Sequence, residues 1–123
     1  MKDKQFSISK RLKSFVFAFN GLKILMKDEH NSRIHFVISV LVIVASVLFG
    51  LNTYEWIAII FSIGLVFTAE IINTAIENIA DFLTTEHNQK IKIIKDLSAA
   101  SVLISAFTAF AIGLIVFLPK VFE

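Results

Sequence analysis

Residues 56–83 have the sequence WIAIIFSIGLVFTAEIINTAIENIADFL, and the two halves of this stretch differ sharply in polarity. The first half is apolar, whereas the second half, from Glu70 onward, carries carboxylates and amides among isoleucines and alanines. A helix needs about 20 mainly apolar residues to cross the hydrocarbon core of a bilayer. The pattern predicts that residues 56–83 form a membrane-spanning helix whose second half presents a polar stripe.

Two other stretches, residues 34–51 and 97–118, contain no Asp, Glu, Lys or Arg. Each is close to the length that spans a bilayer, so we expect the first span at 34–51, the second at 56–83 and the third at 97–118. Pro119 is predicted to end the third helix, because proline cannot continue the backbone hydrogen-bond ladder. The predicted fold class is therefore an all-α integral membrane protein, with residues 1–123 forming a single domain.

The composition excludes several other classes of protein. The 123 residues are 56% hydrophobic and 18% charged, with a mean hydropathy of +0.77. A soluble domain has about 45–50% apolar and roughly 25% charged residues, and so short a chain has too little interior to bury the excess. The net charge of +2 is too small to follow a nucleic-acid backbone. The absence of cysteine excludes a disulfide scaffold, a cysteine-ligated zinc site and a thiol nucleophile.

Residues 7–29 combine basic side chains with apolar ones at helical spacing. The apolar positions are Ile8, Leu12, Phe15, Val16, Phe19 and Leu22. A basic amphipathic helix of this kind typically lies in the plane of the membrane interface. We therefore expect 7–29 to be a surface helix that precedes the first span.

The distribution of Lys and Arg predicts the orientation in the membrane. Eight of these residues precede residue 34, none lies at 52–55, three lie at 84–95 and one follows Pro119. Basic residues favour the cytoplasmic side of a membrane. The N-terminus, the surface helix and the link at 84–94 are thus expected to face the cytoplasm.

The polar stripe of the second span is the most informative feature for function. On a helix with about 100° per residue, Asn73, Glu77 and Asp81 all fall within about 60° of Glu70. A carboxylate at the centre of a span costs about 2.5–3.5 kcal/mol, so an ionisable residue there is a candidate for function. The alternative is that the stripe is a solvated extension of the helix beyond the membrane.

A second cluster, Asp28-Glu29 with Arg33, precedes the first span. It could be simply the capped junction between the surface helix and that span. However, Glu29 is expected at the depth where Glu77 leaves the second span. Two carboxylates from different helices at one depth would suit Mg²⁺, which prefers oxygen ligands.

A third cluster, Lys95-Asp96, precedes the small-residue run Leu97-Ser98-Ala99-Ala100-Ser101. Small residues allow two helices to cross closely. Lys95 could be a membrane-surface anchor, or it could be a point charge that binds a phosphate.

Taken together, these motifs resemble the prokaryotic diacylglycerol kinase family, which includes the undecaprenol kinases. The resemblance covers about residues 9–118. It rests on the sequence EIINTAIE at 70–77 with Asp81 following, on Lys95-Asp96 before small residues, and on Glu29 four residues before Arg33-Ile34-His35.

The resemblance implies a homotrimer whose active sites are shared between subunits, in the inner (cell) membrane of a bacterium. It implies transfer of the ATP γ-phosphate to the hydroxyl of a membrane lipid, with Mg²⁺ as the metal. Glu70 matches the general base of the family, and Glu29 and Glu77 match the metal ligands that also contact the nucleotide. The remaining positions that match the nucleotide site are Arg11, Asn73, Glu86, Lys95 and Asp96. At 86–88 the chain reads Glu-His-Asn, which leaves the roles of His87 and Asn88 open.

We therefore expect an ATP-dependent lipid kinase that acts on undecaprenol or diacylglycerol and binds no nucleic acid. One alternative is a small proton-coupled transporter in which Glu70 is the carrier carboxylate. Another is a non-catalytic assembly subunit in which the stripe joins helices by hydrogen bonds. The transporter does not explain why Glu29, Asn73, Glu77, Lys95 and Asp96 would converge at the cytoplasmic face. An assembly role would fit Asn73 but not three carboxylates.

Overall fold

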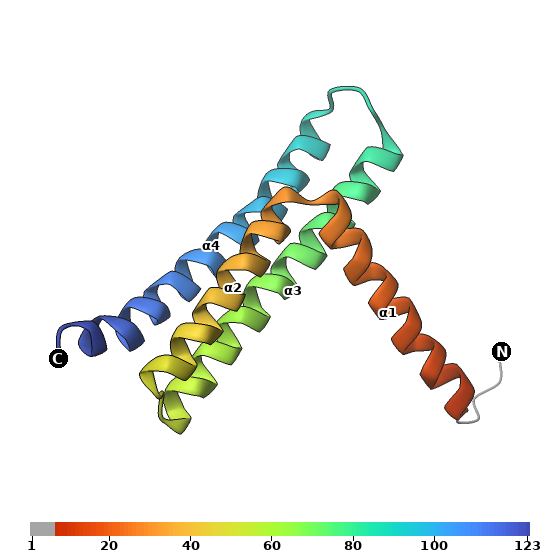
Figure 1. Ribbon diagram of the computed structural model, residues 1–123. Coiled ribbons are helices and arrows are strands. Elements are labelled where there is room, and N and C mark those ends of the chain that lie inside the picture. The colour runs from red at the N-terminus through yellow and green to blue at the C-terminus, as the bar shows by residue number, and fades with distance from the viewer. Residues whose placement is uncertain (1–6) are drawn as a thin grey trace.

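The computed structural model describes residues 7–123, which form four helices and no strand (Figure 1). These helices are α1 (Ile8–Asp28), α2 (His30–Phe49), α3 (Thr53–Leu83) and α4 (Gln89–Val121). The helices α2, α3 and α4 are each long and apolar enough to cross a membrane. The expectation of an all-helical chain with three candidate spans is confirmed. The prediction for the N-terminus, residues 1–6, lies outside the described residues.

Helix α1 meets the other helices at its C-terminal end, and its N-terminal end extends away from them (Figure 1). It begins after Ser7, whose hydroxyl accepts a hydrogen bond from the backbone N–H of Lys10 and so caps the helix. The apolar side chains of its amphipathic face are exposed, among them Leu12, Phe15 and Phe19. Such a face would match a membrane interface, and the assignment of a surface helix stays a prediction.

The break between α1 and α2 is a single extended residue, Glu29, with φ −113° and ψ 112°. Its backbone N–H still bonds the carbonyl of Leu25, which closes α1. Glu29 makes no side-chain cap to α2, so its carboxylate is available for contacts with another helix. Helix α2 then begins at His30, ahead of the predicted start of the first span at residue 34.

The turn between α2 and α3 is tight because Gly50 ends the first helix and Asn52 caps the second only two residues later. Gly50 has φ 69°, the left-handed conformation that commonly ends helices, and Leu51 is buried. Asn52 and Glu55 then form a capping box, in which each side chain accepts the other residue's backbone N–H. This cap explains why α3 begins at Thr53, ahead of the predicted residue 56.

Helix α3 contacts all three other helices, and α4 runs antiparallel beside it (Figure 1). Ion pairs close both ends of this pair: Glu55 with Lys120 at 3.0 Å and Asp81 with Lys95 at 2.6 Å. At the first of these ends, Leu51, Ile59 and Val116 form a small buried apolar cluster. Because α3 packs against both α2 and α4, it is the central helix of the bundle.

Helix α4 is longer than expected at both ends. Asn88 caps its start by accepting the backbone N–H groups of Lys90 and Ile91, so the helix begins at Gln89 rather than at residue 97. The prediction that Pro119 ends the helix is wrong, because α4 continues to Val121. Proline removes only its own N–H from the ladder, and the next turn closes with a bond from the Phe122 N–H to the Leu118 carbonyl.

Candidate active site

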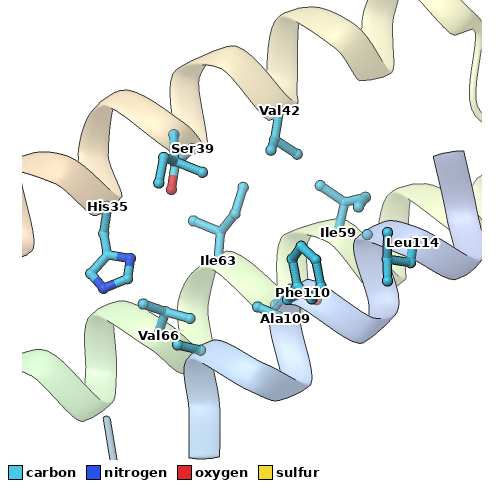
Figure 2. Close-up of a pocket in the computed structure, with 13 residues that line it drawn as sticks. His35, Ser39, Val42, Ile59, Ile63, Val66, Ala109, Phe110 and Leu114 are labelled. Atoms are coloured by element: carbon cyan, nitrogen blue, oxygen red, sulfur yellow. The ribbon is translucent and has the colours of Figure 1, made fainter. Parts of the chain in front are cut away.

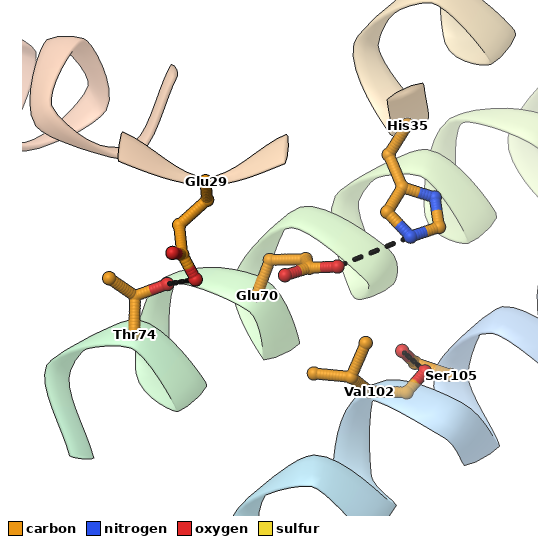
Figure 3. Close-up of polar contacts among 6 residues, drawn as sticks. All are labelled: Glu29, His35, Glu70, Thr74, Val102 and Ser105. Carbon is orange, nitrogen blue, oxygen red and sulfur yellow. Dashed lines mark hydrogen bonds and ion pairs between the residues drawn. The ribbon is translucent and has the colours of Figure 1, made fainter. Parts of the chain in front are cut away.

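Glu70 lies in the interior of the bundle and not on a solvated surface. Its side chain is only 2% exposed, and its Oε1 atom lies 3.2 Å from Nε2 of His35 on α2 (Figure 3). The ring nitrogen is within ion-pair distance but is not aligned for a hydrogen bond, so Oε1 has no hydrogen-bond partner. Asn73, one turn further along α3, is also buried. The alternative of a solvated extension is therefore wrong for Glu70 and Asn73.

The role of His35 was not anticipated from the sequence, although α2 carries a signal for it. Ser32, His35, Ser39 and Ser46 follow one another at spacings of three, four and seven residues, which puts them on one face of the helix. Ser32 and Ser46 are buried, so this polar face is turned toward the bundle interior. A polar face of this kind within an apolar helix predicts a polar partner on another helix, and Glu70 is that partner.

Glu29, at the junction of α1 and α2, and Glu77, on α3, are near enough to interact electrostatically. The hydroxyl of Thr74 donates a hydrogen bond to Oε1 of Glu29 at 3.2 Å, which holds the junction between α1 and α2 against α3 (Figure 3). Glu77 is half-buried one turn beyond Thr74. Its carboxylate interacts electrostatically with the carboxylate of Glu29 and with the ammonium group of Lys95. The two carboxylates therefore form one electronegative site between α3 and the junction.

Helix α4 supplies two polar contacts beside this site. The hydroxyl of Ser98 donates a buried hydrogen bond of 2.7 Å to Oδ1 of Asn73. One turn earlier, Nζ of Lys95 lies 2.6 Å from Oδ1 of Asp81. The small residue Ser98 thus does more than allow close helix packing, because it joins α4 to the polar stripe.

The remaining predicted site residues lie elsewhere in the chain. Asp96 forms an ion pair of 2.7 Å with Lys92 on the exposed surface of α4. Glu86 is exposed in the connection between α3 and α4, where its backbone N–H bonds the Thr84 hydroxyl. Arg11 is in the first turn of α1, at the end that lies away from the bundle (Figure 1). One chain thus brings together Glu29, Glu70, Asn73, Glu77 and Lys95. Asp96, Glu86 and Arg11 lie apart from this group.

The donor set of Glu29 and Glu77 fits Mg²⁺. Within residues 7–123 no three His, Asp or Glu side chains form a complete metal-binding group. Mg²⁺ does not require such a group, because it usually binds through one or two carboxylates together with waters and substrate phosphates. The electronegative pair with a nearby lysine meets that requirement.

An apolar pocket of about 430 Å³ lies between α2, α3 and α4 (Figure 2). His35 and Val66 are at one end of it, and Ile59 and Leu114 are toward the other. Small residues of α4, including Ala109 and Gly113, form part of its wall. His35, which lies beside Glu70, is therefore the polar side chain at one end of this pocket.

A comparison with known protein families shows to which family this sequence belongs. The sequence pattern of the family described as prokaryotic diacylglycerol kinase matches residues 16–117. The chain belongs to this family. The matched range includes every residue of the predicted site except Arg11.

Two relatives within the prokaryotic diacylglycerol kinases are particularly similar to this chain. The undecaprenol kinase of Bacillus subtilis is 35% identical over 119 residues, which are 97% of this chain and 97% of that protein. The diacylglycerol kinase of Synechocystis is 32% identical over 109 residues, which are 88% of this chain and 62% of that protein. Membership of this family makes the chain a lipid kinase of the membrane and leaves the transporter alternative without support.

Proposed function

We propose that this lipid kinase transfers the γ-phosphate of ATP to the hydroxyl group of undecaprenol, with Mg²⁺ as the metal ion. Support for this acceptor comes from the Bacillus subtilis relative, which is named an undecaprenol kinase and matches over 97% of both chains. Diacylglycerol is the alternative acceptor, supported by the name of the Synechocystis relative. In both cases the reaction is phosphoryl transfer to a lipid alcohol.

The observation that carries the proposal is the burial of Glu70 on the same helix face as Glu77. Seven residues of α3 separate them, a rise of about 10 Å. Phosphoryl transfer depends mainly on positioning and on neutralising charge, with a base that orients the attacking hydroxyl. A carboxylate removed from water, deeper in the bundle than the electronegative site, suits a lipid hydroxyl that approaches from the membrane. Glu70 is accordingly the general base.

Glu29 and Glu77 hold Mg²⁺ in this proposal, and Lys95 contacts the phosphates. When bound, the metal ion would neutralise negative charge on the nucleotide phosphates. Thr74 contributes by holding Glu29 against α3 at 3.2 Å. Without that bond, the single extended residue at the junction would not fix the direction of its carboxylate.

The nucleotide site also takes in Asn73, Asp96, Glu86 and Arg11. Because one chain leaves the last three apart from the base, we assign the complete site to a homotrimer in which neighbouring subunits share residues. Support comes from the surfaces of α2, α3 and α4, where many large apolar side chains are exposed. Lipid and neighbouring helices are the surroundings that such surfaces require.

The proposed location is the inner membrane of a bacterium, with the active site at the cytoplasmic face. The electronegative site, the junction between α1 and α2, and the connection between α3 and α4 all lie toward one end of the bundle (Figure 1). Six of the twelve Lys and Arg residues are close to this end, in the last part of α1, the first turn of α2 and the first turns of α4: Lys23, Lys27, Arg33, Lys90, Lys92 and Lys95. A cytoplasmic site would have direct access to ATP.

The deciding experiment is an assay of the purified protein in lipid nanodiscs with Mg-ATP and either undecaprenol or dioctanoylglycerol. We expect lipid phosphate from both alcohols, with the higher kcat/KM for undecaprenol. A higher kcat/KM for the glycerolipid would reverse the acceptor assignment. Absence of product from both alcohols would contradict the proposed function.

A further inference from the structure

The carboxylate of Glu70 is removed from water, and no other residue of α3 compensates its negative charge. A buried carboxylate is costly unless a charge or hydrogen bonds compensate it, and otherwise it becomes neutral by binding a proton. Oε1 of Glu70 has no hydrogen-bond partner in the part of the chain that is described. A protonated carboxyl group could not accept the proton of an attacking alcohol.

Most charged groups around Glu70 make this problem worse. Glu29, from the junction of α1 and α2, and Glu77, on α3 itself, both interact with it electrostatically and both are acidic. Figure 3 shows Val102 and Ser105 of α4 near it, and both side chains are uncharged. Lys95 of α4 is paired with Asp81 further along the bundle.

His35 is the group that can supply a compensating positive charge. It reaches Glu70 from α2 at 3.2 Å, and its side chain is 23% exposed against 2% for Glu70. The imidazole is therefore open to its surroundings while the carboxylate stays buried. Histidine is the side chain whose charge changes most readily near neutral pH.

Three serine hydroxyls of the spans bond within their own helices instead. The hydroxyl of Ser46 bonds the carbonyl of Val42, that of Ser62 bonds Ala58, and that of Ser105 bonds Val102, each within its own helix. These residues satisfy themselves locally and need no partner on another helix. From α2, both the buried Ser32 and His35 interact with the predicted base, and of these two only His35 can carry a charge.

We propose that His35 is a positioning residue of the phosphoryl transfer, which keeps the Glu70 carboxylate ionised and directs Oε1 toward α2. The second carboxylate oxygen is thereby left to accept the hydroxyl proton of the lipid alcohol. This inference rests on the proposed function of Glu70 as general base. His35 also lines the apolar pocket, so it joins the base to the space between α2 and α4 (Figure 2).

The kinetic test compares His35→Gln, which keeps a polar side chain without the charge, with His35→Lys, which returns a cation. For His35→Gln we expect kcat to fall at least tenfold while the KM values for ATP and lipid change less than threefold. His35→Lys should recover part of the lost kcat. The matched control is His30→Gln, the same substitution at an exposed position of α2, which should retain wild-type kcat.

A second readout does not depend on kinase activity. Dicyclohexylcarbodiimide reacts with protonated carboxyl groups in apolar surroundings, and mass spectrometry can follow its adduct on Glu70. At pH 7.5 we expect the His35→Gln protein to be labelled at Glu70 several-fold faster than the wild type or His30→Gln. The additional labelling should be absent from His35→Gln/Glu70→Gln.

The two readouts separate failure of this inference from failure of the proposed function. An inactive wild-type protein would contradict the proposed function, whereas the labelling rates would still report the pairing of His35 with Glu70. Unchanged kcat in His35→Gln would overturn the inference, and so would a change confined to KM. A lower kcat with unchanged labelling would also overturn it, because His35 would then act only on packing.

Discussion

The hydroxyl of Ser98 on α4 donates a hydrogen bond of 2.7 Å to the amide oxygen of Asn73 on α3, and both side chains are buried. This bond is a direct polar link between the third candidate span and the polar stripe of the second. It connects the packing of two long helices to the orientation of a residue assigned to the nucleotide site. Its removal should therefore affect both stability and nucleotide binding.

Ser98→Ala should leave the amide oxygen of Asn73 buried without a donor. We expect a loss of about 1 kcal/mol in the free energy of unfolding, at the lower end of the range for such groups because interhelical bonds in membranes are modest. The KM for ATP should rise several-fold. The measurements are unfolding in mixed detergent micelles and steady-state kinetics. Ser101→Ala is the control, since that hydroxyl bonds a carbonyl of its own helix at 2.6 Å; equal effects of both substitutions would refute the specific role of the link.

Glu70→Gln should abolish the base while preserving the shape of the side chain. General-base catalysis contributes about 10²–10⁴-fold to a rate, so we expect a loss of kcat in that range. Binding of a non-hydrolysable ATP analogue, measured by calorimetry, should change little because the residue lies about 10 Å from Glu77 along α3. The folded state should tolerate the change, since a neutral amide is cheaper to bury than a carboxylate. A variant with near-normal turnover would exclude Glu70 as the base.

Glu77→Gln should alter the response to metal ions. Removing one of two carboxylates from the proposed Mg²⁺ site weakens its hold on the ion, so half-maximal activity should require at least several-fold more Mg²⁺. The dependence is measured by titrating Mg²⁺ at fixed free ATP. Glu55→Gln, at the opposite end of α3, is the matched carboxylate control and should show the wild-type titration. Identical titrations for all three proteins would remove Glu77 from the metal site.

The helical periodicity of residues 70–81 predicted that Glu70 and Asn73 share a face of the helix, and the structure shows both side chains buried. That much follows from local spacing, because about 100° of rotation per residue determines which side chains point the same way. Local spacing does not determine how two helices are rotated about their axes relative to each other. The contact between His35 and Glu70 depends on that rotation. The polar face of α2 therefore predicts that a polar partner exists, but only the structure identifies Glu70 as that partner.

Helix ends were predicted less well than helix faces. Asn52 with Glu55 three residues later is the sequence pattern of a capping box, and Asn88 precedes α4 as a cap. Both signals are visible in the sequence, but the predicted bounds followed hydropathy instead. Hydropathy locates the part of a helix that lipid can cover, whereas caps locate its ends. Residues 89–96, which include Lys92 and Lys95, therefore belong to helix α4 but precede the apolar stretch that hydropathy located.

Subunit mixing should reveal whether the active site is shared. Within one chain, Arg11 lies on α1 away from the base, so an effect of Arg11 on catalysis would have to reach Glu70 of a neighbouring subunit. We expect Arg11→Ala and Glu70→Gln to be strongly impaired when each is reconstituted alone. Co-refolding them in equal amounts should restore up to about one quarter of the wild-type rate, because random assembly of a cyclic trimer gives each site both intact residues in that proportion. Mixing Glu70→Gln with the double variant Arg11→Ala/Glu70→Gln should restore nothing. If the first mixture also stays inactive while the two single variants are demonstrably assembled together, each site is built within one chain and the shared arrangement is wrong.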